Sequence, residues 1–327
     1  MRAVLCKAFG PLEDLEVAQL PSPVPGPGEV LLSVRAAGIN YPDALKVLGR
    51  YQSKPPLPFT PGSEVAGIVK GIGTGSTDAA RFAIGDAVYG TRLTGGFAEE
   101  IAVDARMLRA VPAGRSFEEA ACVSTIYNTS YYALIMLADI RPGDVVLVLG
   151  AAGGAGLAAI EIARARGVRV IAAASTVEKL AVCRQHGANE LINYADDDLR
   201  TRLKELTSGR GVDVVYDPVG GRFSEVALRQ LAWGGRYLVV GFAAGEIPRV
   251  PLNIVLLKGG SVIGVFWGEA MTRDAKLAGE VIDGVADLFR SGQIHPPVSG
   301  RYRFAQVAEA LHALLERRVH GKLVLLP

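Results

Sequence analysis

The sequence has few cysteines and almost no net charge. Its 327 residues include 3 cysteines, Cys6, Cys122 and Cys183, which are far apart and odd in number. This pattern is not typical of a disulfide-bonded secreted protein, so we expect free thiols in a reducing cytoplasm. The formal net charge of +2 produces no strong field, which argues against nucleic acid or an acidic surface as a partner.

The sequence also lacks an apolar segment long enough for a membrane. Residues 145–160 form a run of 16 residues that are all apolar or glycine, whereas a helix needs roughly 18 to 20 such residues to cross a bilayer. The apolar run within residues 1–7 is too short for a signal peptide. We therefore expect neither a membrane span nor secretion.

Within that run, a glycine-rich turn joins a buried strand to a helix that we expect to begin near Leu157. Gly153 and Gly156 have no Cβ, so the backbone can turn tightly and approach a pyrophosphate, which then lies on the N–H groups at the start of the helix. Ala151 stands at the first glycine of the dinucleotide fingerprint G-x-G-x-x-G. Glycines alone are weak evidence, because an ordinary buried turn has them too.

The residues around the turn alternate between helix and strand patterns. We predict helices at 157–166, 177–186, 198–207 and 222–232, and strands at 168–174, 190–193, 212–217, 236–241 and 261–266. This alternation predicts an α/β fold with a doubly wound parallel sheet. The near-continuous apolar strands fit a sheet covered on both faces. In this setting the glycine turn indicates a dinucleotide site.

The end of the second strand indicates which dinucleotide binds. An NAD site usually has Asp or Glu about 20 residues past the glycines, where the carboxylate holds the ribose 2′-hydroxyl and would repel a 2′-phosphate. Here the strand ends in Ser175 and Thr176, with Lys179 one helical turn later and no acid at the tip. Two hydroxyls and a cation favour NADPH. Alternatively, Ser175 is a plain helix N-cap and Lys179 a solvated charge.

The chain is long enough for a second hydrophobic core. Short strands at 30–37, 64–70, 87–89 and 97–103, separated by glycine and proline, predict a β-rich domain. Amphipathic helices at 281–289 and 304–315 and a strand at 322–326 are expected to return to it. We predict a catalytic domain at 1–122, a Rossmann NADP-binding domain inserted at 123–267, and a return to the catalytic domain at 268–327.

Several motifs, in this order along the chain, resemble one family. They are a proline- and glycine-rich opening at 21–28, Ala36-Ala-Gly-Ile-Asn40-Tyr-Pro-Asp43, Pro61-Gly-Ser-Glu64-Val-Ala-Gly67, Gly95-Gly-Phe-Ala-Glu99, the glycine turn, and Gly321-Lys-Leu-Val324. Together they cover nearly the whole chain and resemble the medium-chain dehydrogenase/reductase superfamily. The chain is most similar to its zinc-independent NADPH:quinone oxidoreductases, the zeta-crystallin-like branch. The resemblance implies a GroES-like β-rich domain.

The resemblance also bears on metal binding. Zinc-dependent relatives have Cys where this chain has Asn40 and His where it has Ser63, and neither replacement is a good zinc ligand. The four-cysteine structural lobe of those relatives is missing. The histidines are scattered and are expected to be surface or helix residues rather than ligands; they are His186, His295, His312 and His320. We therefore expect no metal.

Without a metal, hydride transfer from NADPH to an electron-poor quinone or α,β-unsaturated carbonyl fits best. The resemblance distributes residues over the two ends of the cofactor. Those implied at the adenosine end are Gly153, Gly154, Ala155 and Gly156 of the glycine turn, with Ser175, Lys179 and Tyr194. Those implied near the nicotinamide are Asn40, Thr129, Gly241, Phe242 and Ala243, with Phe266 and Trp267 lining the pocket. Lys322 is implied near the phosphates.

Tyr51 is the candidate proton donor. Gly49-Arg-Tyr51 resembles the segment of related enoyl-thioester reductases that carries a tyrosine proposed to protonate the substrate. A phenol can donate a hydrogen bond to a developing enolate or quinol oxygen and supply the proton, and Asp43 would orient it. Alternatively, Tyr51 only packs against the pocket wall and solvent protonates the quinol.

Three functions remain open at this point. The leading one is an NADPH:quinone oxidoreductase, the second is an NADPH-dependent enoyl-thioester or enone reductase, and the third is a non-catalytic NADPH-binding structural protein. The resemblance also implies a homodimer that pairs the edges of the nucleotide-domain sheets. The apolar residues at 254–257 and 261–265 suit such an edge.

Overall fold

The computed structural model describes residues 1–75 and 77–327. Contacts divide the chain into two compact units: unit 1 comprises Met1–Thr125 with Pro296–Pro327, and unit 2 comprises Ile126–His295. The sequence placed the boundaries at 122/123 and 267/268. The second one lies later because α10 (Ala275–Arg290) packs against α3 (Ile126–Tyr131) and α9 (Trp267–Arg273), and so remains in unit 2.

Unit 2 is built on a six-stranded parallel sheet in the order β10-β9-β8-β11-β12-β13. Its strands are β8 (Val145–Leu149), β9 (Arg169–Ala174), β10 (Glu190–Asn193), β11 (Val212–Asp217), β12 (Leu231–Val239) and β13 (Ser261–Gly264). The helices between them are α4 (Gly154–Ala165), α5 (Val177–Gln185), α6 (Leu199–Leu206), α7 (Phe223–Arg229) and α8 (Leu252–Lys258).

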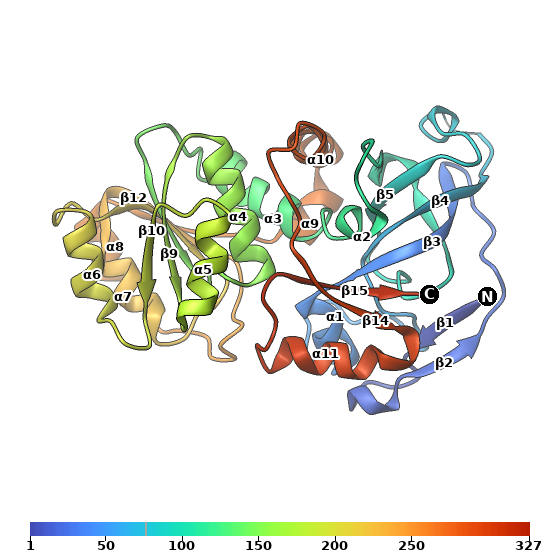
Figure 1. The fold of residues 1–327 in the computed structure, drawn as a ribbon, viewed down its shortest axis with the longest axis horizontal. Coiled ribbons are helices and arrows are strands. Elements are labelled where there is room, and N and C mark those ends of the chain that lie inside the picture. Colours follow the sequence, from blue (N-terminus) through green and yellow to red (C-terminus); the bar gives the residue numbers. More distant parts are fainter. Residues whose placement is uncertain (76) are drawn as a thin grey trace. The chain divides into compact units, whose positions relative to one another are not determined.

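The sheet of unit 2 is covered on both faces, as its buried apolar strands require. In Figure 1, α4 and α5 lie on one side of its strands, and α6, α7 and α8 lie on the other. The strand order reverses between β8 and β11, which is the point where such sheets bind dinucleotides. The predicted doubly wound α/β sheet is confirmed.

Unit 1 contains a seven-stranded sheet in which β14-β15-β3-β4-β5-β7 are neighbours and β6 also pairs with β3. These strands are β3 (Glu29–Ile39), β4 (Glu64–Ile72), β5 (Ala87–Thr91), β6 (Glu100–Asp104), β7 (Leu108–Ala110), β14 (Val298–Arg303) and β15 (Lys322–Leu326). β1 (Arg2–Leu5) and β2 (Glu16–Gln19) form a separate antiparallel pair. The helices are α1 (Tyr41–Val47), α2 (Phe117–Ala120) and α11 (Val307–Leu315). The β-rich fold predicted for this part of the chain is confirmed.

Some elements differ from the sequence prediction. α4 begins at Gly154 rather than near Leu157, so the glycines belong to its first turn. The helix predicted at 222–232 ends at Arg229, and β12 already begins at Leu231, because this residue is buried in the sheet. Periodicity also missed short helices, including α1, α3, α8, α9 and a π-helix at Tyr132–Leu137. None of the helices among the described residues has the length and apolar character needed to cross a membrane.

Candidate functional site

The cofactor residues predicted in unit 2 gather at one edge of its sheet. All six strands are parallel, so their carboxyl ends lie on the same edge. Gly150 follows β8, Ser175 follows β9, and Tyr194 follows β10. The loop Gly241–Ala243 comes after β12, and Phe266 comes after β13. Dinucleotides bind at this edge in doubly wound sheets.

The glycine turn forms a cradle at the start of α4. Gly153 is the N-cap, and the N–H groups of the first turn of this 12-residue helix have no intrahelical acceptor. A Cβ on Gly153 would meet only the carbonyl of Gly150, at 3.4 Å, so the space in front of the turn is open. Gly156 fits tightly, because its Cβ would lie 2.5 Å from the Ala151 carbonyl oxygen. The cradle therefore has room and donors for a phosphate.

Gly150 is the turn residue that sequence reasoning missed. Its φ of 56° is in the left-handed region, and a Cβ there would lie 2.5 Å from Val219. The fingerprint assigns the tight turn to its first glycine, yet here Ala151 fills that position. The residue that makes the tight turn is therefore Gly150, one position earlier, directly after β8. Its presence in the sequence could have indicated this.

Ser175 and Lys179 lie together at the end of β9. Lys179 Nζ donates to Ser175 Oγ at 3.2 Å, and both side chains are half-buried. The N-cap of α5 is Thr176, whose hydroxyl accepts from the Lys179 backbone N–H at 3.2 Å. The alternative that Ser175 is the helix cap is therefore wrong. Its hydroxyl and the ammonium form a polar pair at the strand tip.

The remaining predicted residues of unit 2 have different surroundings. Tyr194 packs against Phe223, with ring centroids 4.4 Å apart and the ring planes tilted by 42°. Trp267 is buried and packs on Tyr132 at 5.6 Å, so it is part of the core of unit 2. Phe266 is exposed at the N-cap of α9, and Thr129 is half-buried in α3.

Asp217, at the end of β11, holds the neighbouring turn together. Its Oδ1 accepts from the backbone N–H groups of Val219 and Gly220, each at 2.8 Å. Its Oδ2 accepts from Ser224 Oγ at 2.9 Å and from the Tyr237 hydroxyl. Burial raises the pKa of Tyr237, and the negative charge of Asp217 raises it further. Sequence reasoning assigned Asp217 no role, although an acid ending an apolar strand was a visible sign.

The loop Gly241–Ala243 lies against this turn. The Ala243 N–H donates to the Pro218 carbonyl at 3.1 Å, and the Gly241 N–H donates to the Asp217 carbonyl at 3.3 Å. Phe242, Tyr237 and Val262 line a mainly apolar cavity of about 130 Å³ with Asp217 at its wall. The turn after β11 therefore fixes the loop that the resemblance implies near the nicotinamide.

In unit 1, Asn40 belongs to a buried polar network with Glu64 and Lys322. Lys322 Nζ donates to Glu64 Oε1 at 2.5 Å, to Asn40 Oδ1 at 2.6 Å and to the Ile39 carbonyl at 3.0 Å. Asn40 Nδ2 donates to Glu64 Oε1 at 2.8 Å, and Thr125 N–H donates to Glu64 Oε2 at 2.8 Å. The resemblance implied Lys322 near the phosphates, whereas here its three donors all have acceptors inside unit 1.

Strand register brings this network together. β15 runs antiparallel to β3 with Leu323 opposite Ile39, so the preceding Lys322 faces Asn40. β4 pairs with the other edge of β3 and sets Glu64 opposite Gly38. A Cβ on Gly38 would overlap both the Glu64 carboxylate and the Ala121 carbonyl. Glycine at this position therefore lets the carboxylate reach across β3.

Asp43 and Tyr51, the other predicted catalytic residues, lie beside this network. Asn40 N–H donates to Asp43 Oδ2 at 2.9 Å, and Asp43 Oδ1 has no hydrogen-bond partner among the described residues. Burial raises the pKa of Asp43, although Lys46 opposes it. Lys46 Nζ lies 5.7 Å from the centre of the Tyr51 ring and donates to the Leu93 carbonyl at 2.6 Å. Burial, reinforced by the Asp43 charge, raises the pKa of Tyr51.

Two histidines, His186 and His312, pair with glutamates, His312 Nε2 lying 2.6 Å from Glu13 Oε1. His186 Nδ1 lies 2.8 Å from Glu161 Oε1 in the core of unit 2, where the Tyr127 hydroxyl and the His295 N–H also donate to this carboxylate, at 2.7 and 2.9 Å. His186 was expected to be a surface or helix residue; it is the C-cap of α5, and 15% of its side chain is exposed. Among residues 1–75 and 77–327, no cluster of three or more His, Cys, Asp or Glu side chains could hold a metal ion.

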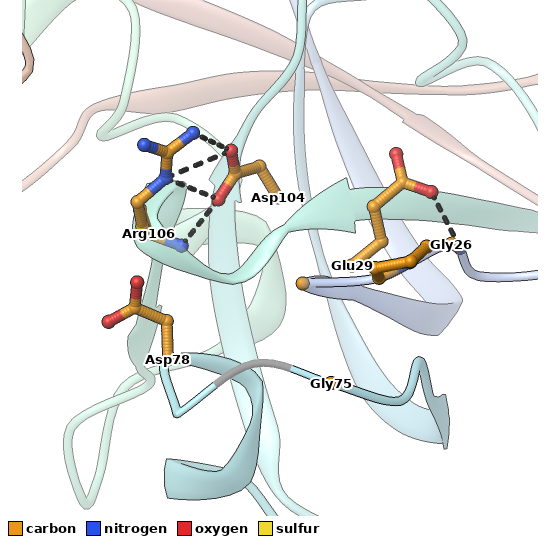
Figure 2. Close-up of a pocket in the computed structure, with 8 residues that line it drawn as sticks. Gly26, Glu29, Gly75, Asp78, Asp104 and Arg106 are labelled. Atoms are coloured by element: carbon orange, nitrogen blue, oxygen red, sulfur yellow. Dashed lines mark hydrogen bonds and ion pairs between the residues drawn. The ribbon is translucent and has the colours of Figure 1, made fainter.

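A second cavity in unit 1 contains none of the predicted site residues. It measures about 600 Å³ and is lined by Gly26, Pro27, Gly28, Glu29, Gly75, Asp78, Asp104 and Arg106. Figure 2 shows that Arg106 turns to Asp104 and that Glu29 turns to the backbone of Gly26. Arg106 thus pairs with Asp104, whereas Glu29 accepts from a backbone N–H, and neither contact indicates redox chemistry.

Comparison with known proteins finds similarity to dehydrogenases and oxidoreductases in both units. Residues 26–113 match the alcohol dehydrogenase GroES-like domain family, and residues 154–283 match the zinc-binding dehydrogenase family. The chain is 38% identical to the quinone oxidoreductase-like protein 2 homolog of Nematostella vectensis, over 99% of this chain and 88% of the relative. It is 32% identical to human quinone oxidoreductase, over 100% and 98%. The structure of Escherichia coli quinone oxidoreductase complexed with NADPH has a TM-score of 0.90 and 30% identity, with both chains fully covered.

Proposed function

The chain belongs to the quinone oxidoreductase branch of the medium-chain dehydrogenase/reductase superfamily, and we propose that it transfers hydride from NADPH to a quinone. One observation carries the choice of cofactor. The tip of β9 presents a hydroxyl and an ammonium, Ser175 and Lys179, where an NAD site would present a carboxylate. This pair suits the 2′-phosphate that distinguishes NADPH.

The cofactor fits the residues present. The open space at Gly153 and the free N–H groups of Gly154, Ala155 and Gly156 suit the pyrophosphate. Tyr194, packed against Phe223, would flank the adenosine end. The bound cofactor supplies the hydride. The residues of the protein fix its position and exclude water from the reacting end.

We propose that the enzyme works without zinc. At the positions of the zinc ligands in zinc-dependent relatives, Asn40 and Ser63 offer an amide and a hydroxyl, which are poor zinc donors. Asn40 is moreover hydrogen-bonded to Lys322 and Glu64. An acceptor that is already electron-poor needs no Lewis acid, and this favours a quinone over a simple ketone.

Within unit 2, the proposed contacts to the nicotinamide come from Thr129 and the loop Gly241–Ala243, with Phe266 at the pocket wall. Trp267 packs in the core of unit 2 behind that wall. An apolar wall next to a few fixed polar groups suits a flat ring. These groups would hold the ring and the acceptor at the short separation that hydride transfer needs.

One observation favours an enone or enoyl-thioester as a second candidate substrate. Burial and the Asp43 charge raise the pKa of Tyr51, so its phenol stays protonated throughout the neutral range. A neutral phenol next to Lys46 can donate a proton to a developing enolate. Asp43 would position this group, because it ties the start of α1 to Asn40. A quinol takes up its proton from solvent with less help.

The test compares acceptors with one enzyme preparation. NADPH oxidation is followed by the absorbance of the reduced nicotinamide, with a naphthoquinone and with crotonyl-CoA as acceptors. We expect faster turnover of the quinone, and we expect Tyr51→Phe to change that rate by less than about threefold, because no dedicated acid is required. Faster thioester turnover that is lost in Tyr51→Phe would establish the reductase alternative. Tight NADPH binding without oxidation by any acceptor would instead indicate a non-catalytic protein.

We further propose a homodimer in the cytoplasm. β13 is an edge strand of the sheet of unit 2, and Val262 on it is exposed, as are Leu256 and Leu257 on α8. Unpaired edge strands and apolar side chains of this kind are typical of sheet-to-sheet association. The three buried free thiols suit a reducing compartment, and fractionation of cells that express the protein would test the location.

A further inference from the structure

The ammonium of Lys322 is a buried cation. Only 3% of its side chain is exposed, and its partner Glu64 is fully buried. The three N–H donors point to three acceptors, the Ile39 carbonyl, Asn40 Oδ1 and Glu64 Oε1. Burying a charge pair removes both ions from water, so the pair is weak evidence for stability, and a role in fixing geometry is the better attested one.

This pair determines which way the Asn40 amide points. Lysine offers only donors, so the atom facing Lys322 must be the amide oxygen. Glutamate offers only acceptors, so the atom facing Glu64 must be the amide nitrogen. An amide between two neutral partners could flip, but here both ends are assigned by charge. Nδ2 also lies 3.5 Å from Thr125 Oγ1, and its second hydrogen is directed toward this hydroxyl.

The cation also changes the amide as a donor. A positive charge 2.6 Å from Oδ1 draws electron density from the nitrogen, which makes the Nδ2 hydrogens better donors. In this chain a fixed ammonium and an oriented amide therefore lie where zinc-dependent relatives place a metal ligand. The long contact to Thr125 leaves the second Nδ2 hydrogen available for a stronger acceptor.

We propose that Lys322 is a positioning residue that, paired with Glu64, holds the Asn40 amide with Nδ2 oriented as a hydrogen-bond donor for the bound reactant. The inference rests on the proposed function for one point only, which is the identity of the ligand that Asn40 contacts. The orientation of the amide is a property of unit 1 alone. Lys322 thereby acts through Asn40 and not through the phosphates.

The first measurement needs neither cofactor nor activity. Proteins labelled with 15N-asparagine are compared by NMR, with the Asn40 side-chain signals assigned by their absence in Asn40→Ala. We expect the wild-type Nδ2 hydrogens to exchange slowly with water, and to exchange at least about 10-fold faster in Lys322→Met. If Lys322→Met does not fold, Lys322→Met/Glu64→Gln removes both charges and takes its place. Equal exchange rates in wild type and variant would overturn the proposal.

The second measurement is a double-mutant cycle between Lys322 and Asn40. Removing a residue that orients a functional group typically costs about 10- to 100-fold in activity. We expect Lys322→Met to lower kcat by this factor in the wild-type background, but by less than about threefold when Asn40 is already alanine. NADPH affinity, measured by fluorescence titration, should show the same lack of additivity. Independent effects, or no effect of Lys322→Met, would contradict the proposal.

Arg115→Met is the matched control. Arg115 is a cation with 16% of its side chain exposed, and it pairs with Glu119, four residues further along unit 1. Its removal should leave both the Asn40 exchange rate and kcat near wild type in either background. Absence of quinone reduction by the wild type would reject the proposed function, but the exchange experiment would still decide the role of Lys322.

Discussion

Lys179 is the residue on which the preference for NADPH depends. Its Nζ lies 3.2 Å from Ser175 Oγ at the end of β9. A hydrogen bond between charged groups contributes roughly 1.5–3 kcal/mol, which is about 10- to 100-fold in affinity. We expect Lys179→Ala to raise the KM for NADPH by about 10-fold or more and to leave the KM for NADH close to wild type. Steady-state kinetics with a single quinone measures both.

Lys204→Ala provides the control for that experiment. Lys204 is an exposed lysine on α6 of the same unit, so its removal lowers the net charge equally and should not change either KM. Wild-type enzyme that uses NADH as efficiently as NADPH would show that the cation at the strand tip does not select the cofactor. The same follows if Lys179→Ala keeps the wild-type preference.

At the level of single residues, sequence alone could pair side chains that are close together along the chain. Ser175 and Lys179 are four residues apart, and a strand-to-helix turn brings such residues together. Lys322 and Asn40 are separated by 282 residues, and only the register of β15 on β3 makes them partners. No local pattern reports that register, so sequence alone could not pair Lys322 with Asn40.

At the level of secondary structure elements, the prediction concerns the edge strand β13 and the dimer. A lysine on an exposed edge strand prevents pairing with another edge, because the pair would bury the charge. We expect Val262→Lys to shift the protein from dimer to monomer in analytical ultracentrifugation, with the far-UV circular dichroism spectrum unchanged. Ile84→Lys replaces an equally apolar exposed residue of unit 1 and should leave the dimer intact. A wild type that sediments as a monomer would rule out the proposed dimer.

Long, regular elements were the predictable ones. The alternation of apolar strands and helices in unit 2 predicted its parallel sheet, because the central strands β8, β9 and β11 are buried almost along their whole length. Short helices such as α1 and α9 have seven residues each, too few for a helical period to emerge. The start of β12 was missed for another reason, since Leu231 and Ala232 have helix-compatible side chains but are buried in the sheet.

At the level of the whole molecule, each unit contains buried groups whose pKa is raised. In unit 2, burial raises the pKa of Cys183 to about 12 from an ordinary value of 9.0, and it also raises the pKa of Tyr216 and Tyr237. In unit 1, burial raises the pKa of Cys6 and Cys122. These groups are neutral when protonated, so folding favours their protonated forms.

The consequence is a loss of stability at alkaline pH. Above pH about 9 the unfolded chain releases the Cys183 proton while the folded chain keeps it, so the free energy of unfolding falls as pH rises. By pH 11 this thiol alone accounts for about 2 to 3 kcal/mol, at 1.36 kcal/mol for each pKa unit. Both tryptophans, Trp233 and Trp267, lie in unit 2, so their fluorescence in urea reports the unit that contains Cys183. We expect the urea midpoint to fall between pH 8 and pH 11, and to fall less in Cys183→Ala. Equal pH slopes in the two proteins would show that the thiol ionises alike in the folded and unfolded chains.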